Sequence, residues 1–271
     1  MLDPVLYHTK CTFRTCNAIS HLPQNYNIIF IAPNNFLTND EKKLKTPIIG
    51  VKRRNNEKNE YFCINKTYPP MENEERTVLY LHGFASAGSS GTATHLRNSL
   101  YEYGIKVVAP DIPPMPTEAM EMLQRLVAEI SPCLIVGTSM GAFYAEQIHG
   151  IPRILVNPSF HTARLLTFRG LGKREYRNKR EDGAKDFKVD KEMINQFKEL
   201  EKNSFQQITD AEKELVWGLF GLQDKNVNCQ PDFKKHYGNT HFITYQGEHY
   251  LNDQALKKTV FPLVKQLLQL T

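Results

Sequence analysis

A chain of 271 residues, of which 41% are hydrophobic, is long enough to bury a substantial core. Its net charge of +5, from 34 basic and 29 acidic residues, is too small to indicate nucleic-acid binding by itself. No apolar run reaches membrane-spanning length, and the first residues, MLDPVLYHTKCTF, lack the basic and then apolar pattern of a signal peptide. The composition therefore predicts a soluble, cytoplasmic protein without a nucleic-acid or membrane partner.

The cysteines give no sign of a metal site, because they form no CxxC pair and no His-rich spacing accompanies them. The chain contains Cys11, Cys16, Cys63, Cys133 and Cys229. Reduced thiols are the expected state in the cytoplasm, although Cys11 and Cys16 could form a local disulfide if the protein were exported. We expect no metal ion and no organic cofactor.

The first 75 residues differ in texture from the rest of the chain. NIIFIAP and PIIGVKRR have the composition of strands, and EYFCINK is expected to pair with the second of them across RNNEKNE. No helical pattern is evident there. Residues 1–75 are therefore predicted to form a β-rich extension, which is either a hairpin on the edge of the main sheet or a small module that binds a protein partner.

Residues 76–271 alternate short apolar runs with helical patterns. Strands are expected in RTVLYLHG, IKVVAPD, CLIVG, RILVNPS, LVWGLFG and HFITYQG. One of the helices between them is predicted to begin after Thr117, as N-cap, and to run to Ile130. This alternation predicts an α/β domain of three layers, with a mostly parallel sheet and helices on both faces.

The segment CLIVGTSMGAFYAEQI places a serine between a predicted strand and a predicted helix. Its core, Gly137-Thr138-Ser139-Met140-Gly141, matches the G-x-S-x-G nucleophile elbow of α/β hydrolases. The glycines on either side allow a strained turn that exposes the hydroxyl at the carboxyl end of a strand. The alternative is a serine that caps a helix in a Rossmann-like nucleotide-binding protein.

A nucleophilic serine requires a base and an acid, which follow it in chain order in this fold. His249, in YQGEHYL, comes directly after the last predicted strand and is the expected base. Asp224 follows LVWGLFG in the loop GLQDKNV and is the favoured acid, with Asp232 as its rival.

Two backbone N–H groups are predicted to stabilise the oxyanion. One belongs to Met140, the residue after the serine, and the other to Phe84 in the loop HGFASAGSSG. A phosphate-binding glycine loop is the alternative for that segment, but neither a P-loop nor a G-x-G-x-x-G pattern occurs there.

Several segments resemble the α/β-hydrolase superfamily and, more narrowly, the small bacterial YqiA-like esterases. They are LYLHGFAS, VVAPDIPPMP, IVGTSMGAFYAEQI, ILVNPS, GLQD and GEHYL, and together they extend over about residues 77 to 268. The resemblance implies hydrolysis of carboxylic esters, of short or aromatic acyl groups, without a metal or an organic cofactor.

An insertion over residues 159–214 separates the fourth and fifth predicted strands of this domain. Its first half is rich in Arg and Lys, with interleaved acids, and its second half carries Ile194, Phe197 and Leu200 at helical spacing. A lid over the active site is the functional interpretation, and a solvated charged connector is the other.

Taken together, the residues predict a serine esterase that acts on a small ester. Ser139 would attack the carbonyl carbon, His249 would transfer the proton, and Asp224 would orient the imidazole. An acyltransferase or a thioesterase on the same triad remains an alternative, as does a hydrolase scaffold that only binds a ligand or a partner.

Overall fold

The computed structural model describes residues 26–31, 48–53, 61–63 and 76–270, and for the first three of these segments it describes the backbone alone. The chain divides into two compact units, Met1–Glu72 and Asn73–Thr271. Cys11 and Cys16, with the local disulfide considered for them, lie outside the described residues.

In the first unit, three strands form an antiparallel sheet in the order β1-β2-β3. The strands are β1 (Tyr26–Ile31), β2 (Ile48–Arg53) and β3 (Tyr61–Cys63). Gly50 lies opposite Cys63 and Lys52 opposite Tyr61, so the expected pairing of EYFCINK with PIIGVKRR is present. The edge hairpin and the separate module both remain interpretations of this unit.

The second unit is built on a parallel sheet of six strands in the order β11-β10-β7-β6-β4-β5. Its strands are β4 (Thr77–Leu81), β5 (Lys106–Val108), β6 (Leu134–Thr138), β7 (Arg153–Val156), β10 (Val216–Gly221) and β11 (Phe242–Tyr245). Each lies within one of the six apolar runs identified in the sequence, apart from Thr138, one residue past CLIVG. The predicted α/β fold with a mostly parallel sheet is confirmed.

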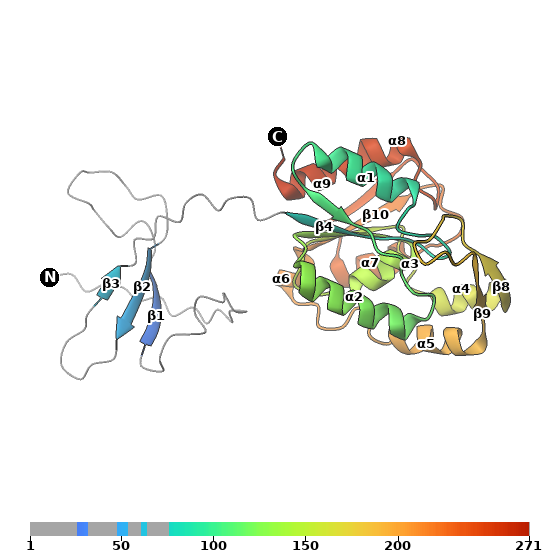
Figure 1. The fold of residues 1–271 in the computed structure, drawn as a ribbon, viewed down its shortest axis with the longest axis horizontal. Helices are drawn as coiled ribbons and strands as arrows, with labels where there is room; N and C mark the ends of the chain where they lie inside the picture. Colours follow the sequence, from blue (N-terminus) through green and yellow to red (C-terminus); the bar gives the residue numbers. More distant parts are fainter. Residues whose placement is uncertain (1–25, 32–47, 54–60, 64–75, 271) are drawn as a thin grey trace. The chain divides into compact units, whose positions relative to one another are not determined.

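Helices cover both faces of this sheet (Figure 1). On one face lie α1 (Gly91–Tyr101), α8 (Asp253–Ala255), the π-helical turn η2 (Leu256–Val260) and α9 (Phe261–Leu268). On the other lie α2 (Pro116–Ile130), α3 (Met140–Glu146), α5 (Lys191–Glu201) and α7 (Gln230–Tyr237). None of the helices in the described residues is long and apolar enough to cross a membrane.

Each face of the sheet has its own hydrophobic core, and side chains that alternate along the buried strands contribute to the two cores in turn. In β4, Val78 and Tyr80 pack into the core beneath α1 and α9, whereas Leu79 and Leu81 pack beneath α2 and α3. Successive side chains of a strand point to opposite faces, so a continuous apolar run serves two helical layers at once.

Helix α2 begins two residues earlier than the sequence pattern suggested. Met115 is its N-cap, without a side-chain hydrogen bond, and Pro116 is the first helical residue. The prediction of Thr117 as N-cap is wrong because proline, with its fixed φ and missing N–H, is well suited to the first helical position. The Thr117 N–H instead donates to Gln196 Oε1 at 3.2 Å, which ties α2 to α5.

The insertion folds into several short elements: α4 (Thr162–Arg169), the antiparallel pair β8 (Gly172–Glu175) and β9 (Asp186–Val189), α5, and α6 (Asp210–Lys213). Helix α5 does not cover the site. Phe197 is fully buried, with its ring centroid 6.1 Å from that of Phe143 and 6.4 Å from that of Tyr144, both on α3. Phe197 is therefore a core residue.

Candidate active site

Ser139 lies in the tight turn between β6 and α3, where its backbone adopts φ 54° and ψ −116°. A non-glycine residue in such a region costs on the order of 1–3 kcal/mol and persists only where neighbouring structure imposes it. Here the Ser139 N–H donates to Val156 O at 2.9 Å, while Ser139 O accepts from the N–H groups of Ala142 and Phe143. The turn is therefore held by β7 on one side and by α3 on the other.

The two glycines of the G-x-S-x-G segment allow strand and helix to approach closely. A Cβ atom on Gly137 would lie 2.6 Å from Ala142 Cα, and one on Gly141 would lie 2.1 Å from Leu81 O. Both distances are shorter than any van der Waals contact, so a larger residue at either position would force α3 away from the sheet. The sequence interpretation of these glycines agrees with this packing.

Ser139, His249 and Asp224 form a continuous hydrogen-bonded chain. The Ser139 hydroxyl lies 2.9 Å from His249 Nε2, and His249 Nδ1 lies 2.7 Å from Asp224 Oδ2. In the neutral tautomer that fits both contacts, Nδ1–H donates to the carboxylate and Nε2 accepts the serine proton. The three residues predicted from the sequence thus lie together, although their catalytic roles remain predictions.

Asp224 is fixed by its own loop. Its Oδ1 accepts the N–H groups of Asn226 at 2.8 Å and of Val227 at 3.0 Å, which leaves Oδ2 for His249. Burial acts to raise the pKa of Asp224, but the hydrogen bonds from His249 and from these two N–H groups hold it below its usual value. The carboxylate is therefore ionised at neutral pH and can orient an imidazole.

Asp232, the rival acid, lies in a different group of residues. Its Oδ2 is 3.2 Å from His161 Nε2, and the possible ligand atoms of Asp232, His161 and Cys229 lie within 4.8 Å of one another. The cluster combines residue types that bind metal ions, but burial raises the pKa of the Cys229 thiol to about 12. We interpret it as a hydrogen-bonded surface pair of His161 and Asp232 beside a buried, protonated thiol.

The predicted oxyanion donors border the same pocket as Ser139. Phe84 and Met140 line a pocket of about 200 Å³ together with Ser139 and His249. No group in the described part of the chain accepts a hydrogen bond from the backbone N–H of Phe84 or of Met140. Two unpaired N–H groups beside a serine hydroxyl are the arrangement that an oxyanion hole requires.

His82 supports the loop that carries Phe84, a role that sequence reasoning did not assign. Its Nδ1–H donates to Gly83 O at 2.9 Å, and its Nε2 accepts the Ile112 N–H at 3.0 Å. Burial lowers the pKa of His82 to about 4, so the ring is neutral and can hold both contacts. The motif His-Gly before Phe84 was the only signal in the sequence.

Asn157 performs a similar task for the loops that carry His249 and Asp224. Its side-chain amide donates to Glu248 O and His249 O, both at 3.0 Å, and its Oδ1 accepts the Gly221 N–H at 2.7 Å. Asn157 is 3% exposed and follows β7 directly. Its partners lie 64 to 92 residues further along the chain, so no local pattern could have identified them.

The pocket is closed on one side by the first half of the insertion. Thr162, Leu165, Leu166 and Arg169 contribute from α4, and Arg177 and Asn178 contribute from the segment after β8. Phe197 and Leu200 do not line it. The lid interpretation therefore applies to residues 162–178 and not to α5.

Two solved structures illustrate the similarity of the fold. Est1E from Butyrivibrio proteoclasticus, with ferulic acid bound, is 18% identical, and the alignment covers 74% of this chain and 91% of that one at a TM-score of 0.50. A protein of Agrobacterium vitis S4, assigned provisionally as a hydrolase, is 14% identical, with 91% and 100% covered and a TM-score of 0.50. At these identities the similarity shows the α/β-hydrolase fold alone.

The family comparison extends over most of the second unit. Residues 77–261 match the family described as "Uncharacterised protein family (UPF0227)", and they make up more than half of the chain. The chain therefore belongs to the UPF0227 family, and its second unit has the α/β-hydrolase fold.

Proposed function

We propose that the protein is a serine hydrolase that cleaves carboxylic esters through an acyl-enzyme intermediate. The observation that carries the proposal is the hydrogen-bonded chain from Ser139 through His249 to Asp224, which opens into a pocket at the carboxyl edge of the sheet. A structural serine would need neither an imidazole at 2.9 Å nor a strained backbone that presents its hydroxyl to a pocket.

In the first half of the reaction, Ser139 Oγ attacks the ester carbonyl carbon while His249 Nε2 accepts the hydroxyl proton. The negative charge that develops on the carbonyl oxygen is stabilised by the N–H groups of Phe84 and Met140. Asp224 stabilises the imidazolium that forms. The protonated Nε2 then gives its proton to the leaving alcohol as the carbon–oxygen bond breaks, and Ser139 retains the acyl group.

In the second half, water replaces the alcohol. His249 Nε2 accepts a proton from this water as its oxygen attacks the acyl carbon, and returns the proton to Ser139 Oγ as the carboxylic acid leaves. The same steps with an alcohol or thiol in place of water would constitute acyl transfer, so the proportion of the two reactions is set by the acceptor.

A fluorophosphonate probe tests the proposal directly. The probe should label the wild-type protein stoichiometrically, with the adduct mapped to Ser139 by mass spectrometry, because the reagent phosphonylates only an activated serine. Ser139→Ala should not be labelled, and Asp232→Asn should be labelled as fast as the wild type. Labelling at another serine, or none in the folded wild type, would contradict the proposal.

A further inference from the structure

Among the described residues, those that line the pocket beside Ser139 include two arginines and no acid. Arg169, on the last turn of α4, and Arg177, after β8, both contribute to its wall. The wall contains no Asp and no Glu, and its other polar members are hydroxyls, Asn178 and His249. An ester that consisted only of neutral groups would have no use for two guanidinium groups at this place.

In the part of the chain that the structure describes, no carboxylate neutralises either arginine. Among the described residues, no ion pair joins Arg169 or Arg177 to an acid, in contrast to Arg180, which binds Asp182 at 2.9 Å. The acids interleaved in the sequence of the insertion therefore do not cancel these charges. Asp182 is occupied by Arg180, and Asp186 by Lys173 at 2.8 Å.

Arg177 is held in a fixed relation to the reacting groups. Its backbone N–H donates to Ala85 O at 2.9 Å, one residue after the oxyanion donor Phe84. Its guanidinium carbon lies 4.5 Å from the centroid of the Tyr250 ring, and Tyr250 follows His249. Stacking on an aromatic face leaves the in-plane N–H donors free to bind an anion.

Two serine side chains in the loop after Phe84 also attach the segment that carries Arg177. The Ser86 hydroxyl donates to Asn178 Oδ1 at 2.9 Å, and the Ser89 hydroxyl donates to Lys179 O at 2.5 Å. The segment with Arg177 is thereby fastened to the loop with Phe84. An anionic group bound by Arg177 would accordingly sit at a defined distance from the ester carbonyl.

We propose that the substrate of this site carries an anionic oxygen group, a carboxylate or a phosphate, which Arg169 and Arg177 bind while the ester lies at Ser139. The inference rests on the proposed esterase function and specifies its substrate class. Guanidinium groups bind both anions through paired N–H donors, so the chemistry is shared and the test separates the two sources.

Matched esters provide the kinetic test. The 4-nitrophenyl monoester of glutaric acid and 4-nitrophenyl 4-phosphonobutanoate carry the charge on the acyl side, and 4-nitrophenyl valerate is the neutral counterpart. A second pair, 4-carboxyphenyl and 4-carbamoylphenyl valerate, moves the charge to the leaving group. For at least one anionic ester, kcat/KM should exceed that of its counterpart by about tenfold or more at low salt, with the ratio falling as salt is added.

Arginine variants test whether Arg169 and Arg177 cause the preference for anionic esters. Arg169→Gln and Arg177→Gln should each lower the ratio of anionic to neutral kcat/KM by about tenfold, mainly through KM, and Arg177→Lys should retain part of it. Arg164→Gln is the matched control, because Arg164 is an exposed arginine of α4 outside this pocket. Equal turnover of charged and neutral esters, or a ratio that these variants leave unchanged, would overturn the proposal.

A binding measurement separates this inference from the esterase proposal. Calorimetry with glutarate and with inorganic phosphate is performed on Ser139→Ala, which has no nucleophile. Binding of either anion that weakens about tenfold in the added Arg177→Gln, but not in the added Arg164→Gln, would support the anion site even if no ester were hydrolysed. Absence of binding by both anions would refute it, even if neutral esters were cleaved.

Discussion

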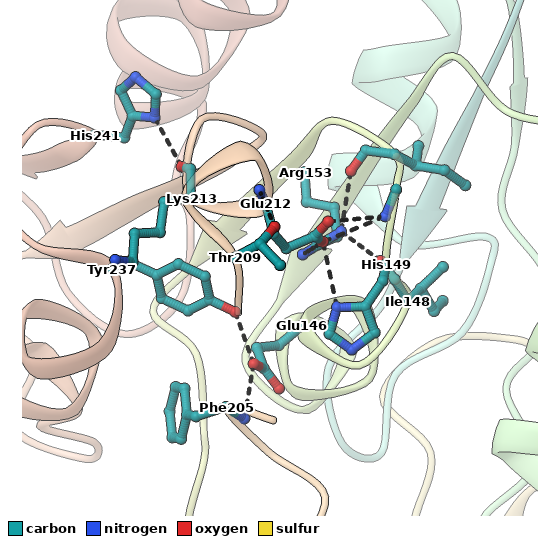
Figure 2. Close-up of polar contacts among 12 residues, drawn as sticks. Glu146, Ile148, His149, Arg153, Phe205, Thr209, Glu212, Lys213, Tyr237 and His241 are labelled. Atoms are coloured by element: carbon teal, nitrogen blue, oxygen red, sulfur yellow. Dashed lines mark hydrogen bonds and ion pairs between the residues drawn. The ribbon is translucent and has the colours of Figure 1, made fainter. Parts of the chain in front are cut away.

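The two ends of helix α3 both hold polar side chains inside the protein, and they differ in what surrounds those side chains. At the first end, Ser139 joins His249 and Asp224 beside a pocket. At the second end, Glu146 accepts the Tyr237 hydroxyl at 2.7 Å and the Phe205 N–H at 3.0 Å (Figure 2). Glu146 is not among the residues that line the pocket beside Ser139.

A second polar group lies beside Glu146 and is centred on a buried arginine. Arg153, at the start of β7, is fully buried and donates to Glu212 Oε1 at 2.5 Å and to Ile148 O at 2.5 Å (Figure 2). Glu212 also accepts the Gly150 N–H and lies 3.3 Å from His149 Nδ1. This network connects the end of α3 to α6 and β7. Glu146 and this network are called the closed end of α3, and the triad and pocket at Ser139 the open end.

The two ends of α3 together show that a displaced pKa does not by itself mark an active site. Burial raises the pKa of Glu146 and carries that of Tyr237 far above its usual range, yet neither residue lines the pocket beside Ser139. The open end of α3 differs by its pocket, its strained serine and its unpaired N–H groups. These three features, more than burial of charge, separate a candidate catalytic site from a structural network.

The largest expected effect is at the open end. Ser139→Ala should lower kcat/KM for a simple ester on the order of 10⁶-fold, because the nucleophile is lost, and His249→Ala should lower it by a similar factor. The double variant should be no worse than either single one, since the two residues act as a unit. Steady-state kinetics with 4-nitrophenyl valerate gives the factors, and urea unfolding of each variant serves as control for the fold. Near-normal turnover in either variant would refute the triad.

The second-largest expected effect distinguishes Asp224 from Asp232 as the acid of the triad. Asp224→Asn should lower kcat/KM by about 10⁴-fold, because an amide at this position favours the wrong imidazole tautomer. Asp232→Asn changes the same atom type in a residue outside the hydrogen-bonded chain and should change kcat/KM less than about twofold. If Asp232→Asn proved the damaging change, the acid of the triad would have to be reassigned.

Much of the open end could be predicted from sequence because its signals are local. The glycines around Ser139 are required by contacts to Ala142, in the helix after the turn, and to Leu81 O in β4. The G-x-S-x-G pattern between a predicted strand and a predicted helix already indicates such close packing. His249 and Asp224 follow from chain order and from their places after predicted strands. The alternation of six apolar runs with helical patterns is also a local signal, and it predicted the α/β fold.

The closed end could not be predicted because its partners come from distant segments. Glu146 binds residues 59 and 91 positions away, and nothing in MGAFYAEQ distinguishes it from a solvated helix residue. Periodicity located a helix around Phe197 but could not tell which layer its apolar face would join. The same limit applies to Asn157, whose partners are backbone groups of two later loops.

At the closed end, Arg153→Met should destabilise the protein by about 3–5 kcal/mol, because it leaves Glu212 without its buried cation. The double variant Arg153→Met with Glu212→Leu should recover much of that loss, since neither charge is then left unpaired. Urea unfolding measures both changes. The fraction that remains folded should retain wild-type kcat/KM, and a loss of activity without a loss of stability would mean that the network serves the reaction.

The smallest expected effect concerns the protonation of Glu146. Burial raises its pKa above 4.5, the value expected in an unfolded chain, so the folded state keeps its proton at pH values where the unfolded state releases it. The contribution of Glu146 to stability is therefore complete below pH 4.5 and is lost as the pH rises through the raised pKa of the folded state.

Glu146→Gln should remove that loss, because an amide resembles the protonated acid and still accepts from Tyr237 and Phe205. Relative to the wild type, the variant should therefore gain stability progressively as the pH is raised from 4.5 to 8. Urea unfolding across this pH range measures the difference, and kcat/KM should not change. A constant difference in stability at every pH would mean that Glu146 is ionised in the folded protein, and that the two ends of α3 differ less than their surroundings indicate.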